Sequence, residues 1–531
     1  MLVNGLTIGR GTIFECDFCI IGTGMGGAAL ARKLVADHRD VLLVEAGNIN
    51  SSDDTSTITA SEEGHPFGLA ISRSISLGGT SGRWHGICAP LDELDFDRRP
   101  WITGSGWPIT RADLMQYYQE ASTALNIPGC AYFEARDLDP QLQKRLADIE
   151  YDTSVLEPKL FQYRRPPQRW RQSLLTMAKQ DQLRCLFNTP ALELLTDESG
   201  GRVDALLIGT GQGTALVKAR VFIVCAGALE TPRLLLNSRQ RHSAGLGNSH
   251  DLVGRYLLDH PMGHFCKLKF TRPTHAPLYS SFSLKNQIHL MTGMMMSPAR
   301  QQRHSLANHY VWLRPAVTAN RINDELLLSF LAVRRAIDLR FKQAVGLVTN
   351  RDLLYRVAVH QFGFSPRYRY GDLVFMTEQL PNPSSRVQLS GRIRDRYNYP
   401  VAQVEWRLTE DDFKGFSAYT KVLFENGLRS KAYHLARIDA EEEWRRTVNS
   451  AAHHLGTARM GADPRHGVVD RDLKVFGTEN LFVADGSVFT TAGAVNPSLT
   501  IVALALRLAG HLSRASTSAA VTSMSNSLLH H

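Results

Sequence analysis

The chain begins with a glycine-rich turn between an apolar run and a helix, the pattern of a dinucleotide-binding unit. The apolar run 17–22 leads into Gly22-Thr-Gly24-Met-Gly-Gly27, and after an Ala- and Leu-rich segment a second run, 41–45, ends at Glu45. We expect a tight turn at Gly22, a pyrophosphate close to Gly24, and close helix–strand packing at Gly27. An acid about 20 residues further on binds ribose hydroxyls, which assigns that role to Glu45. The sequence therefore predicts a βαβ unit that holds a dinucleotide.

Two later segments repeat the pattern of a strand followed by a turn. The run 221–225 ends at Ala226 and leads into a helix expected over 231–237, with Pro232 in its first turn. The run 481–484 stops at Asp485-Gly486, and a helix is expected over 497–512. We therefore predict a discontinuous nucleotide-binding domain made of residues 1–95, 185–264 and 445–512.

The intervening segments, 96–184 and 265–444, are predicted to form a second domain together with connecting and lid segments. Short β-rich runs at 372–378, 386–389 and 401–406 favour an antiparallel sheet with one face on a substrate. The expected fold class is an α/β Rossmann-type domain with a second, α+β domain built on that antiparallel sheet.

Two further stretches stand apart from this scheme. Residues 323–370 are arginine-rich and predicted to be helical, and they include Arg334, Arg335, Arg351 and Arg356. A lid, a partner-docking surface, a membrane-surface patch and plain solvated helices all remain open for them. Residues 513–531, rich in Ser, Thr and Ala, are predicted to form a disordered tail.

Charge and cysteine content exclude several classes of protein. The net charge of +9 is spread over 531 residues without a nucleic-acid recognition motif, so no nucleic acid is expected as a partner. No apolar run reaches the roughly 18 residues of a transmembrane helix, and the N-terminus lacks a signal-peptide pattern. We expect a cytoplasmic protein, with export alongside a partner subunit left open.

The seven cysteines are dispersed, and Cys16 and Cys19 point to opposite faces of a strand, so neither a disulfide framework nor a metal site is expected.

A second glycine turn lies outside the βαβ unit. Gly78-Gly79-Thr80-Ser81 precedes Trp84, His85 and Gly86. A flexible turn with hydroxyl donors suits a cofactor too long for one loop to hold, and it would contact the pyrophosphate and the redox ring. A glycine pair of this kind is also compatible with a plain turn.

These segments together resemble the glucose–methanol–choline (GMC) oxidoreductase family. The matching stretches follow the family order along nearly the whole chain: 22–27, 45–47, 78–81, 225–232, 252–261, 378–387, 453–461 and 485–506. The resemblance implies an FAD cofactor, a two-domain fold and oxidation of an alcohol to a carbonyl. In its motifs the chain is most similar to the sugar-oxidising branch that includes pyranose 2-oxidase.

The resemblance also implies further cofactor contacts. Asp485 is expected at the ribityl chain and the backbone near Ala191 at the adenine. Ala226, Gly486, Asn496 and Pro497 complete the expected cofactor-binding set. Some family members hold FAD covalently through a histidine after the glycine pair, but Arg83 stands at that place and His85 is out of register. We therefore expect non-covalent FAD.

Oxidation of an alcohol requires a hydride acceptor and a base for the hydroxyl proton. The family pattern His-x-x-Gly-Thr, counted back from Gly456-Thr457, selects His453 as the base rather than His454, to which we assign packing or hydrogen bonding. Asn496 is the expected catalytic partner, because its amide can hold the substrate oxygen without titrating. N-capping of the following helix is the alternative role for Asn496. That helix would also direct its positive end at the flavin's N1–O2 edge.

Several functions and partners remain open at this stage. The alternatives to redox chemistry are a non-redox FAD-containing lyase that cleaves cyanohydrins and a flavoprotein that has lost its redox activity. A NAD-dependent dehydrogenase would leave the C-terminal half-site unexplained. The expected substrate is a small-molecule alcohol, preferably a sugar, polyol or glycosylated natural product. The electron acceptor is oxygen, a quinone or a redox protein, and the chain has no haem-binding C-x-x-C-H of its own.

Overall fold

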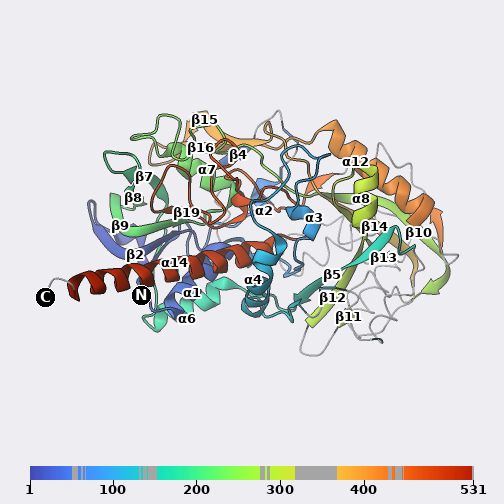
Figure 1. The fold of residues 1–531 in the computed structure, drawn as a ribbon, viewed down its shortest axis with the longest axis horizontal. Helices are drawn as coiled ribbons and strands as arrows, with labels where there is room; N and C mark the ends of the chain where they lie inside the picture. Colours follow the sequence, from blue (N-terminus) through green and yellow to red (C-terminus); the bar gives the residue numbers. More distant parts are fainter. Residues whose placement is uncertain are drawn as a thin grey trace, which may run out of the picture.

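The computed structural model describes the chain except for residues 51–57, 61–63, 66, 131–132, 135–139, 141–151, 275–281, 284–287, 317–367, 428–432, 437–444, 446–447 and 529–531. Two large β-sheets lie at opposite ends of an elongated molecule, with loops and short helices between them (Figure 1). Across the described part of the chain, no helix combines the length and the apolar character that a membrane crossing requires.

The first sheet has eight strands and confirms the predicted Rossmann-type domain. Its order is β1-β6-β3-β2-β9-β8-β7, and β19 pairs with β9. The strands are β1 (Leu2–Asn4), β2 (Ile13–Ile21), β3 (Val41–Val44), β6 (Arg184–Phe187), β7 (Ala191–Thr196), β8 (Val203–Thr210), β9 (Gly213–Val224) and β19 (Leu481–Val483). All neighbours pair in parallel except β7 with β8 and β8 with β9.

The register of this sheet brings distant segments of the chain to one edge. Ile21 pairs with Val44 on one side and with Val224 on the other, and Val483 pairs with Val224 in turn. Because parallel strands end at the same edge of a sheet, the turns that follow β2, β9 and β19 meet there. That edge carries the glycine turn at 22–27 and the Asp485 turn.

Helices cover this sheet and also extend beyond it. α1 (Met25–Ala36) packs on α14 (Ser498–Leu528), and α4 (Arg111–Ala124) packs on α14 through a 3.0 Å hydrogen bond between the Tyr118 and Thr500 hydroxyls. Within the described residues, the other helices are η1 (Gly5–Thr7), α2 (Leu69–Ser72), η2 (Gly79–Gly82), α3 (Glu93–Phe96), α6 (Trp170–Lys179), α7 (Gly227–Asn237), α8 (Pro298–His304), α12 (Glu410–Val422), the π-helix η5 (Leu423–Gly427) and η6 (Gly486–Val488).

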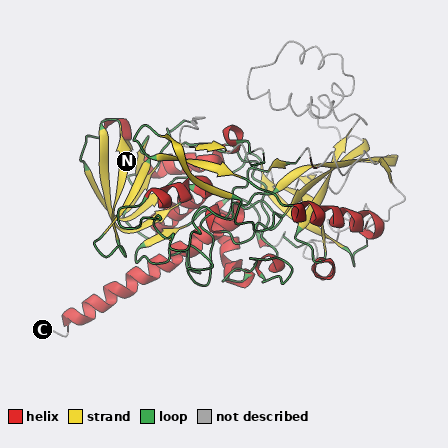
Figure 2. Cartoon of the chain, turned by 90° about the horizontal axis from the view of Figure 1, so that it is seen from above, coloured by secondary structure: helices red, strands yellow, loops and turns green. Residues whose placement is uncertain are grey.

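α14 corrects one expectation. It does not end at Leu512 but continues to Leu528, through most of the segment for which we expected disorder, and it projects from the body with the C-terminus at its far end (Figure 2). After Gly510 the segment contains no glycine or proline to end the helix, and alanine favours helix. The Ser- and Thr-rich composition was therefore a poor guide to this segment.

α7 corrects a second expectation, because it begins at Gly227 and Pro232 consequently lies inside the helix rather than in its first turn. Proline has no N–H to donate to the carbonyl four residues earlier, which here belongs to Ala228. The Thr457 hydroxyl donates to that carbonyl instead, at 2.8 Å. The segment that contains Thr457 is thus joined to α7 at the Ala228 carbonyl, which lacks a helical donor because of Pro232.

The second sheet confirms the predicted antiparallel substrate domain. Its order is β11-β12-β13-β14-β10-β17, with β5 on β12 and β18 on β10, and every pairing is antiparallel. The strands are β5 (Leu156–Arg164), β10 (Pro261–Thr274), β11 (Phe282–Ser283), β12 (Ile288–Met296), β13 (His309–Ala316), β14 (Tyr368–Thr377), β17 (Tyr433–Ala436) and β18 (Asn449–Ser450). α12 covers one face, where Phe416 and Tyr419 pack with strand residues such as Phe375 in one buried cluster.

Two of the three predicted middle strands lie elsewhere. β15 (Arg386–Arg394) and β16 (Pro400–Glu405) form a separate three-stranded sheet with β4 (Ile58–Ala60), and this sheet packs on α7. Arg233 of α7 fixes the contact, because its Nη2 lies 2.6 Å from Asp395 Oδ2 and its Nε donates to the Pro400 carbonyl at 3.0 Å. Alternation of apolar and polar residues fits a strand in any half-buried sheet, so the sequence pattern could not say which sheet these strands would join. The arginine-rich segment 323–370 lies outside the described residues except for the start of β14.

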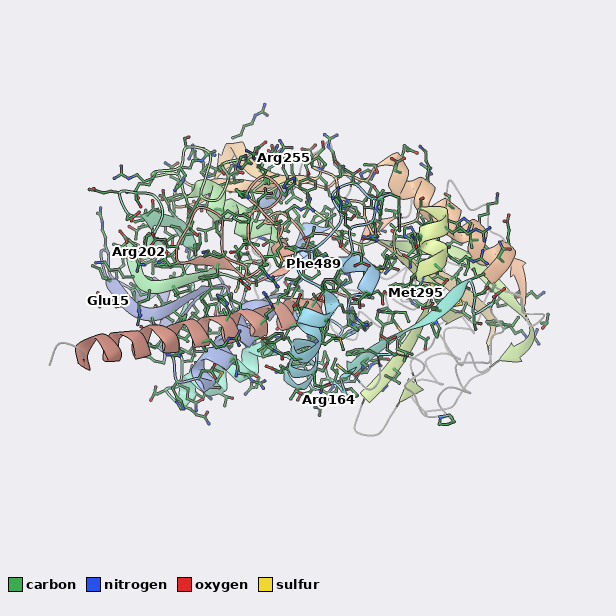
Figure 3. The ribbon with its side chains drawn as sticks, in the orientation of Figure 1. Glu15, Arg164, Arg202, Arg255, Met295 and Phe489 are labelled. Atoms are coloured by element: carbon green, nitrogen blue, oxygen red, sulfur yellow. The ribbon has the colours of Figure 1, made fainter. Side chains whose placement is uncertain are left out.

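The two halves meet in a shared core. Met295, Tyr310 and Met376 of the second sheet belong to the same buried cluster as strand residues of the first sheet. Phe489, which follows η6, is fully buried and packs edge-on against Trp107 at a ring-centroid distance of 5.1 Å. Figure 3 labels Phe489 near the middle of the molecule, with Met295 on the substrate-domain side.

Candidate active site

The first glycine turn combines closed and open positions. Gly22 has φ +101°, and a Cβ there would collide with the Cys225 carbonyl. A Cβ on Gly27 would collide with the Gly22 carbonyl, whereas a Cβ on Gly24 would meet nothing within 4 Å. Gly22 and Gly27 therefore serve backbone packing, and Gly24 faces open space at the N-terminus of α1. Helix N-termini offer amides without intrahelical partners to a phosphate.

The second glycine turn lies directly against the first. Gly78 and Gly79 have φ of +88° and +56°, and a Cβ on Gly79 would stand 2.9 Å from the Gly24 Cα. The Gly78 amide donates to the Thr23 hydroxyl at 2.9 Å. Thr80 and Ser81 follow in η2, where the buried Ser81 hydroxyl donates to the Gly78 carbonyl at 2.6 Å. Loops more than fifty residues apart thus form one double turn, as expected for two parts of one cofactor site.

Glu45 directly follows β3 at the same edge of the sheet. Its carboxylate accepts hydrogen bonds from the Gly47 amide at 2.8 Å, the Thr23 amide at 3.1 Å and the Thr23 hydroxyl. Burial raises the pKa of Glu45, and these donors oppose the rise. The Thr189 amide donates to the Glu45 carbonyl at 2.8 Å, which places the start of β7 at Ala191 nearby. The ribose and adenine contacts of Glu45 and Ala191 stay predictions.

Asp485 is more heavily engaged than the sequence suggests. Its Oδ2 accepts from the Gly227 amide at 2.8 Å and from the Thr231 hydroxyl at 2.7 Å, and its Oδ1 accepts from the Ser487 amide at 2.8 Å. Asp485 therefore joins the N-terminus of α7, next to Ala226, to η6, which begins at Gly486. The ribityl contact remains a prediction for a carboxylate that already has three donors.

His453 and Asn496 come together although 43 residues separate them. The Asn496 Nδ2 lies 3.1 Å from the His453 Nε2. α14 begins at Ser498, after Pro497, and the Asn496 side chain faces the imidazole rather than capping the helix. Burial lowers the pKa of His453 well below 6.5, and the imidazoles of His260, His454 and His85 add to the effect. His453 is therefore a neutral imidazole at physiological pH.

His454 diverges from its neighbour, as an extended segment requires. Its ring packs on Phe67 at a centroid distance of 4.8 Å. Burial lowers its pKa to about 3, so it stays uncharged. The geometry gives His454 a packing contact and gives His453 the contact with Asn496.

Sequence reasoning missed two residues of this site, Asp259 and His260. The His260 Nδ1 lies 2.9 Å from the His453 Nδ1. The Asp259 Oδ1 accepts from the backbone amides of His260 at 2.6 Å and of His453 at 3.1 Å. Both residues are fully buried. Both residues lie in the stretch 252–261 that resembles the family, but we assigned no role to them from the sequence.

The residues of this edge fit a bound FAD. Gly24 would leave room for a pyrophosphate, the exposed Thr80 of the second turn would offer a hydroxyl, and Glu45 would offer a carboxylate to a ribose. The imidazole of His453 and the amide of Asn496 come from the C-terminal part of the sequence. Among the described residues, no group of three His, Cys, Asp or Glu side chains could hold a metal ion.

Comparisons with known proteins relate the chain to flavin-dependent oxidoreductases. A family model described as "GMC oxidoreductase" matches residues 381–505, and one described as "FAD dependent oxidoreductase" matches residues 17–248. The chain is 25% identical to 6'''-hydroxyparomomycin C oxidase of Streptomyces lividus over 93% of this chain and 92% of that protein. It is 28% identical to 2-methyl-1,2-propanediol dehydrogenase of Mycolicibacterium austroafricanum over 61% of this chain, and 27% identical to the fructose dehydrogenase large subunit of Gluconobacter japonicus over 55%. These two alignments span 53% and 47% of the relatives' own length.

Solved structures share the fold. The likeness to pyridoxine 4-oxidase from Mesorbium loti has a TM-score of 0.53 at 19% identity and covers 93% of this chain and 99% of that one. The likeness to formate oxidase has a TM-score of 0.54 at 17% identity and covers 95% of this chain and 99% of that one. At such identities the likeness concerns architecture alone.

Proposed function

We propose that the chain is a GMC oxidoreductase and that it oxidises a CH–OH group of a sugar, polyol or glycosylated natural product to a carbonyl. FAD, when bound, supplies the redox chemistry by accepting a hydride from the alcohol carbon. The hydroxyl proton goes to the Nε2 of His453.

One observation carries the proposal. The His453 Nε2 and the Asn496 Nδ2 lie 3.1 Å apart. The His453 segment also reaches the turn after β19, because the Gly456 amide donates to the Gly486 carbonyl at 3.1 Å. An alcohol oxygen that displaces the direct contact between His453 and Asn496 and lies beside both groups meets an acceptor for its proton and an amide N–H that stabilises the developing alkoxide. A neutral imidazole is the state that such a base needs, and burial favours it.

The substrate class rests on the relatives. Their names describe oxidation of a diol, of aminoglycosides, of fructose and of C-glycosides. All of these molecules carry vicinal or multiple hydroxyl groups. A polyhydroxylated donor is common to these five relatives, though not to the cholesterol oxidases that match 11% of this chain. The pyranose 2-oxidase-like branch stays part of the proposal.

We further propose that FAD is bound without a covalent link and that electrons leave to oxygen, a quinone or a redox protein. The half-buried Arg83 stands where covalent members carry histidine. The relative named as a large subunit supports a partner subunit as one route for electrons.

Anaerobic mixing of the FAD-loaded protein with a donor panel tests the function. The panel holds 2-methyl-1,2-propanediol, fructose and an aminoglycoside. We expect at least one donor to bleach the oxidised flavin band, and His453→Ala to slow bleaching by about 10²-fold or more, the usual scale for a lost acid–base group.

His454→Gln is the matched control, because it changes the neighbouring imidazole that packs on Phe67. Its bleaching rate should stay within roughly one order of magnitude of the wild type, well short of the acid–base loss. An unchanged rate in His453→Ala refutes the base assignment. Cleavage of a cyanohydrin without bleaching by any alcohol would instead identify the lyase alternative.

A further inference from the structure

We propose that His260 is a positioning residue that fixes the tautomer of His453, so that the unprotonated Nε2 of His453 faces the substrate. The proposal rests on the proposed role of His453 as the base. The two rings stand almost perpendicular, with an interplanar angle of 81° and centroids 5.1 Å apart, and their Nδ1 atoms are 2.9 Å apart. Only one of two facing nitrogens can donate in a neutral pair, so their protonation is linked.

Which of the two Nδ1 atoms carries the proton is determined by the contacts of the other ring nitrogen of His260, its Nε2. The His260 Nε2 lies 3.1 Å from the Ala492 carbonyl oxygen and 3.0 Å from the Gly493 carbonyl oxygen. A carbonyl can only accept a hydrogen bond, so the His260 Nε2 carries a proton. Burial lowers the pKa of His260 to about 4, and the ring therefore holds a single proton near neutral pH. The His260 Nδ1 is consequently bare and accepts.

The same logic then fixes His453. Its Nδ1 faces an acceptor at 2.9 Å and must carry the ring's proton. Because His453 is also neutral, its Nε2 has a free lone pair, and the Asn496 amide N–H can donate to it at 3.1 Å. The carbonyls of Ala492 and Gly493 lie just before Asn496 in the chain, so one loop controls both ends of the hydrogen-bonded series.

Asp259 fixes the backbone of His260 and His453 and makes no hydrogen bond to either imidazole ring. Its carboxylate accepts from the amides of both histidines, and the Ser450 hydroxyl donates to its Oδ2 at 2.6 Å. The carboxylate of Glu378 acts on His260 at longer range but is itself paired with Arg99, at 2.7 and 2.5 Å. The pair of imidazoles is therefore oriented by neutral donors and acceptors.

The proton balance follows from this geometry. The alcohol O–H bond breaks and an N–H bond forms at the His453 Nε2. The series ends on backbone carbonyls, which cannot take up a proton, so the proton does not pass through His260 and leaves from the Nε2 side. His260 thus prepares the base and is not a relay.

Two substitutions of similar size separate this role from packing. In His260→Asn the side-chain oxygen can take the place of Nδ1 and still accept from His453, while the donor to the two carbonyls is lost. In His260→Gln the amide N–H can reach those carbonyls, while nothing occupies the place of Nδ1. We expect His260→Gln to reduce the rate of anaerobic flavin reduction by roughly tenfold or more, the rate equivalent of one lost hydrogen bond. His260→Asn should be slowed less than His260→Gln, because its amide oxygen can still accept from the His453 Nδ1, and KM should change little in either variant.

Equal rates for the two variants, or a slower Asn variant, would overturn the proposal, while the effect of His453→Ala would still decide the function separately. A second measurement needs no turnover. In ¹⁵N NMR of wild-type holoenzyme with labelled histidine, the resonances lost in His453→Ala should show a protonated Nδ1 and an unprotonated Nε2. The opposite tautomer would overturn the proposal even where a His260 variant fails to load FAD.

Discussion

The two sides of the site are built from different parts of the polypeptide. The cofactor side is made of backbone, at glycines whose neighbours leave no room for a side chain or leave open space for a ligand. The base side is made of side chains whose protonation depends on partners drawn from three distant segments. Backbone requirements leave a mark in the sequence, because only glycine satisfies them. A hydrogen-bond partner such as His260 leaves no comparable mark.

Substitutions at the glycines of the first turn should have the largest effects, and they test whether the cofactor side depends on backbone. A Cβ on Gly27 would collide with the Gly22 carbonyl, whereas one on Gly24 would meet nothing within 4 Å. We expect Gly27→Ala to destabilise the apoprotein by about 3 kcal/mol or more, as overpacking against backbone does, and to abolish FAD loading. Gly24→Ala should leave the unfolding of the apoprotein within about 1 kcal/mol of the wild type.

FAD titration separates the two substitutions further. The Gly24→Ala methyl group would occupy the space assigned to the pyrophosphate, so its FAD affinity should fall while its fold persists. Undiminished FAD binding by Gly24→Ala would show that the open face of this turn is not the cofactor cradle. Equal apoprotein stability of both variants would contradict the division into packing and binding glycines.

A smaller effect is expected where the base segment is tied to α7. Thr457→Val removes the hydroxyl that donates to the Ala228 carbonyl, which Pro232 leaves without its helical donor. A buried carbonyl without a partner should lower the free energy of unfolding by about 1–3 kcal/mol. Thr457→Ser keeps the hydroxyl and is the matched control. Indistinguishable denaturant midpoints for the two variants would show that the hydroxyl does not stabilise this junction.

How far the sequence leads depends on the kind of interaction. The strands at 17–22, 41–45, 221–225 and 481–484 follow from local patterns, because glycine and β-rich runs have few alternatives. The second glycine turn was expected only to contact the same cofactor as the first. The assignment of His453 and Asn496 came from a family resemblance, and the 3.1 Å contact brings them together.

The remaining features depend on tertiary context. The runs at 386–389 and 401–406 have the alternation of any half-buried strand. They lie in a separate sheet with β4, whose contact with α7 includes Arg233 and Asp395. The place of Pro232 inside α7 depended on a hydroxyl from residue 457. The role of His260 depended on two carbonyls more than two hundred residues away. Such long-range partners are not encoded in spacing.

The most direct test of the account is a crystal structure of the protein with FAD bound. The account predicts a pyrophosphate against Gly24 and the second glycine turn, with the reactive face of the flavin ring beside the His453 Nε2 and the Asn496 amide. A flavin bound at this edge with the imidazole of His453 turned away from the ring, or a nucleotide bound elsewhere on the chain, would contradict it.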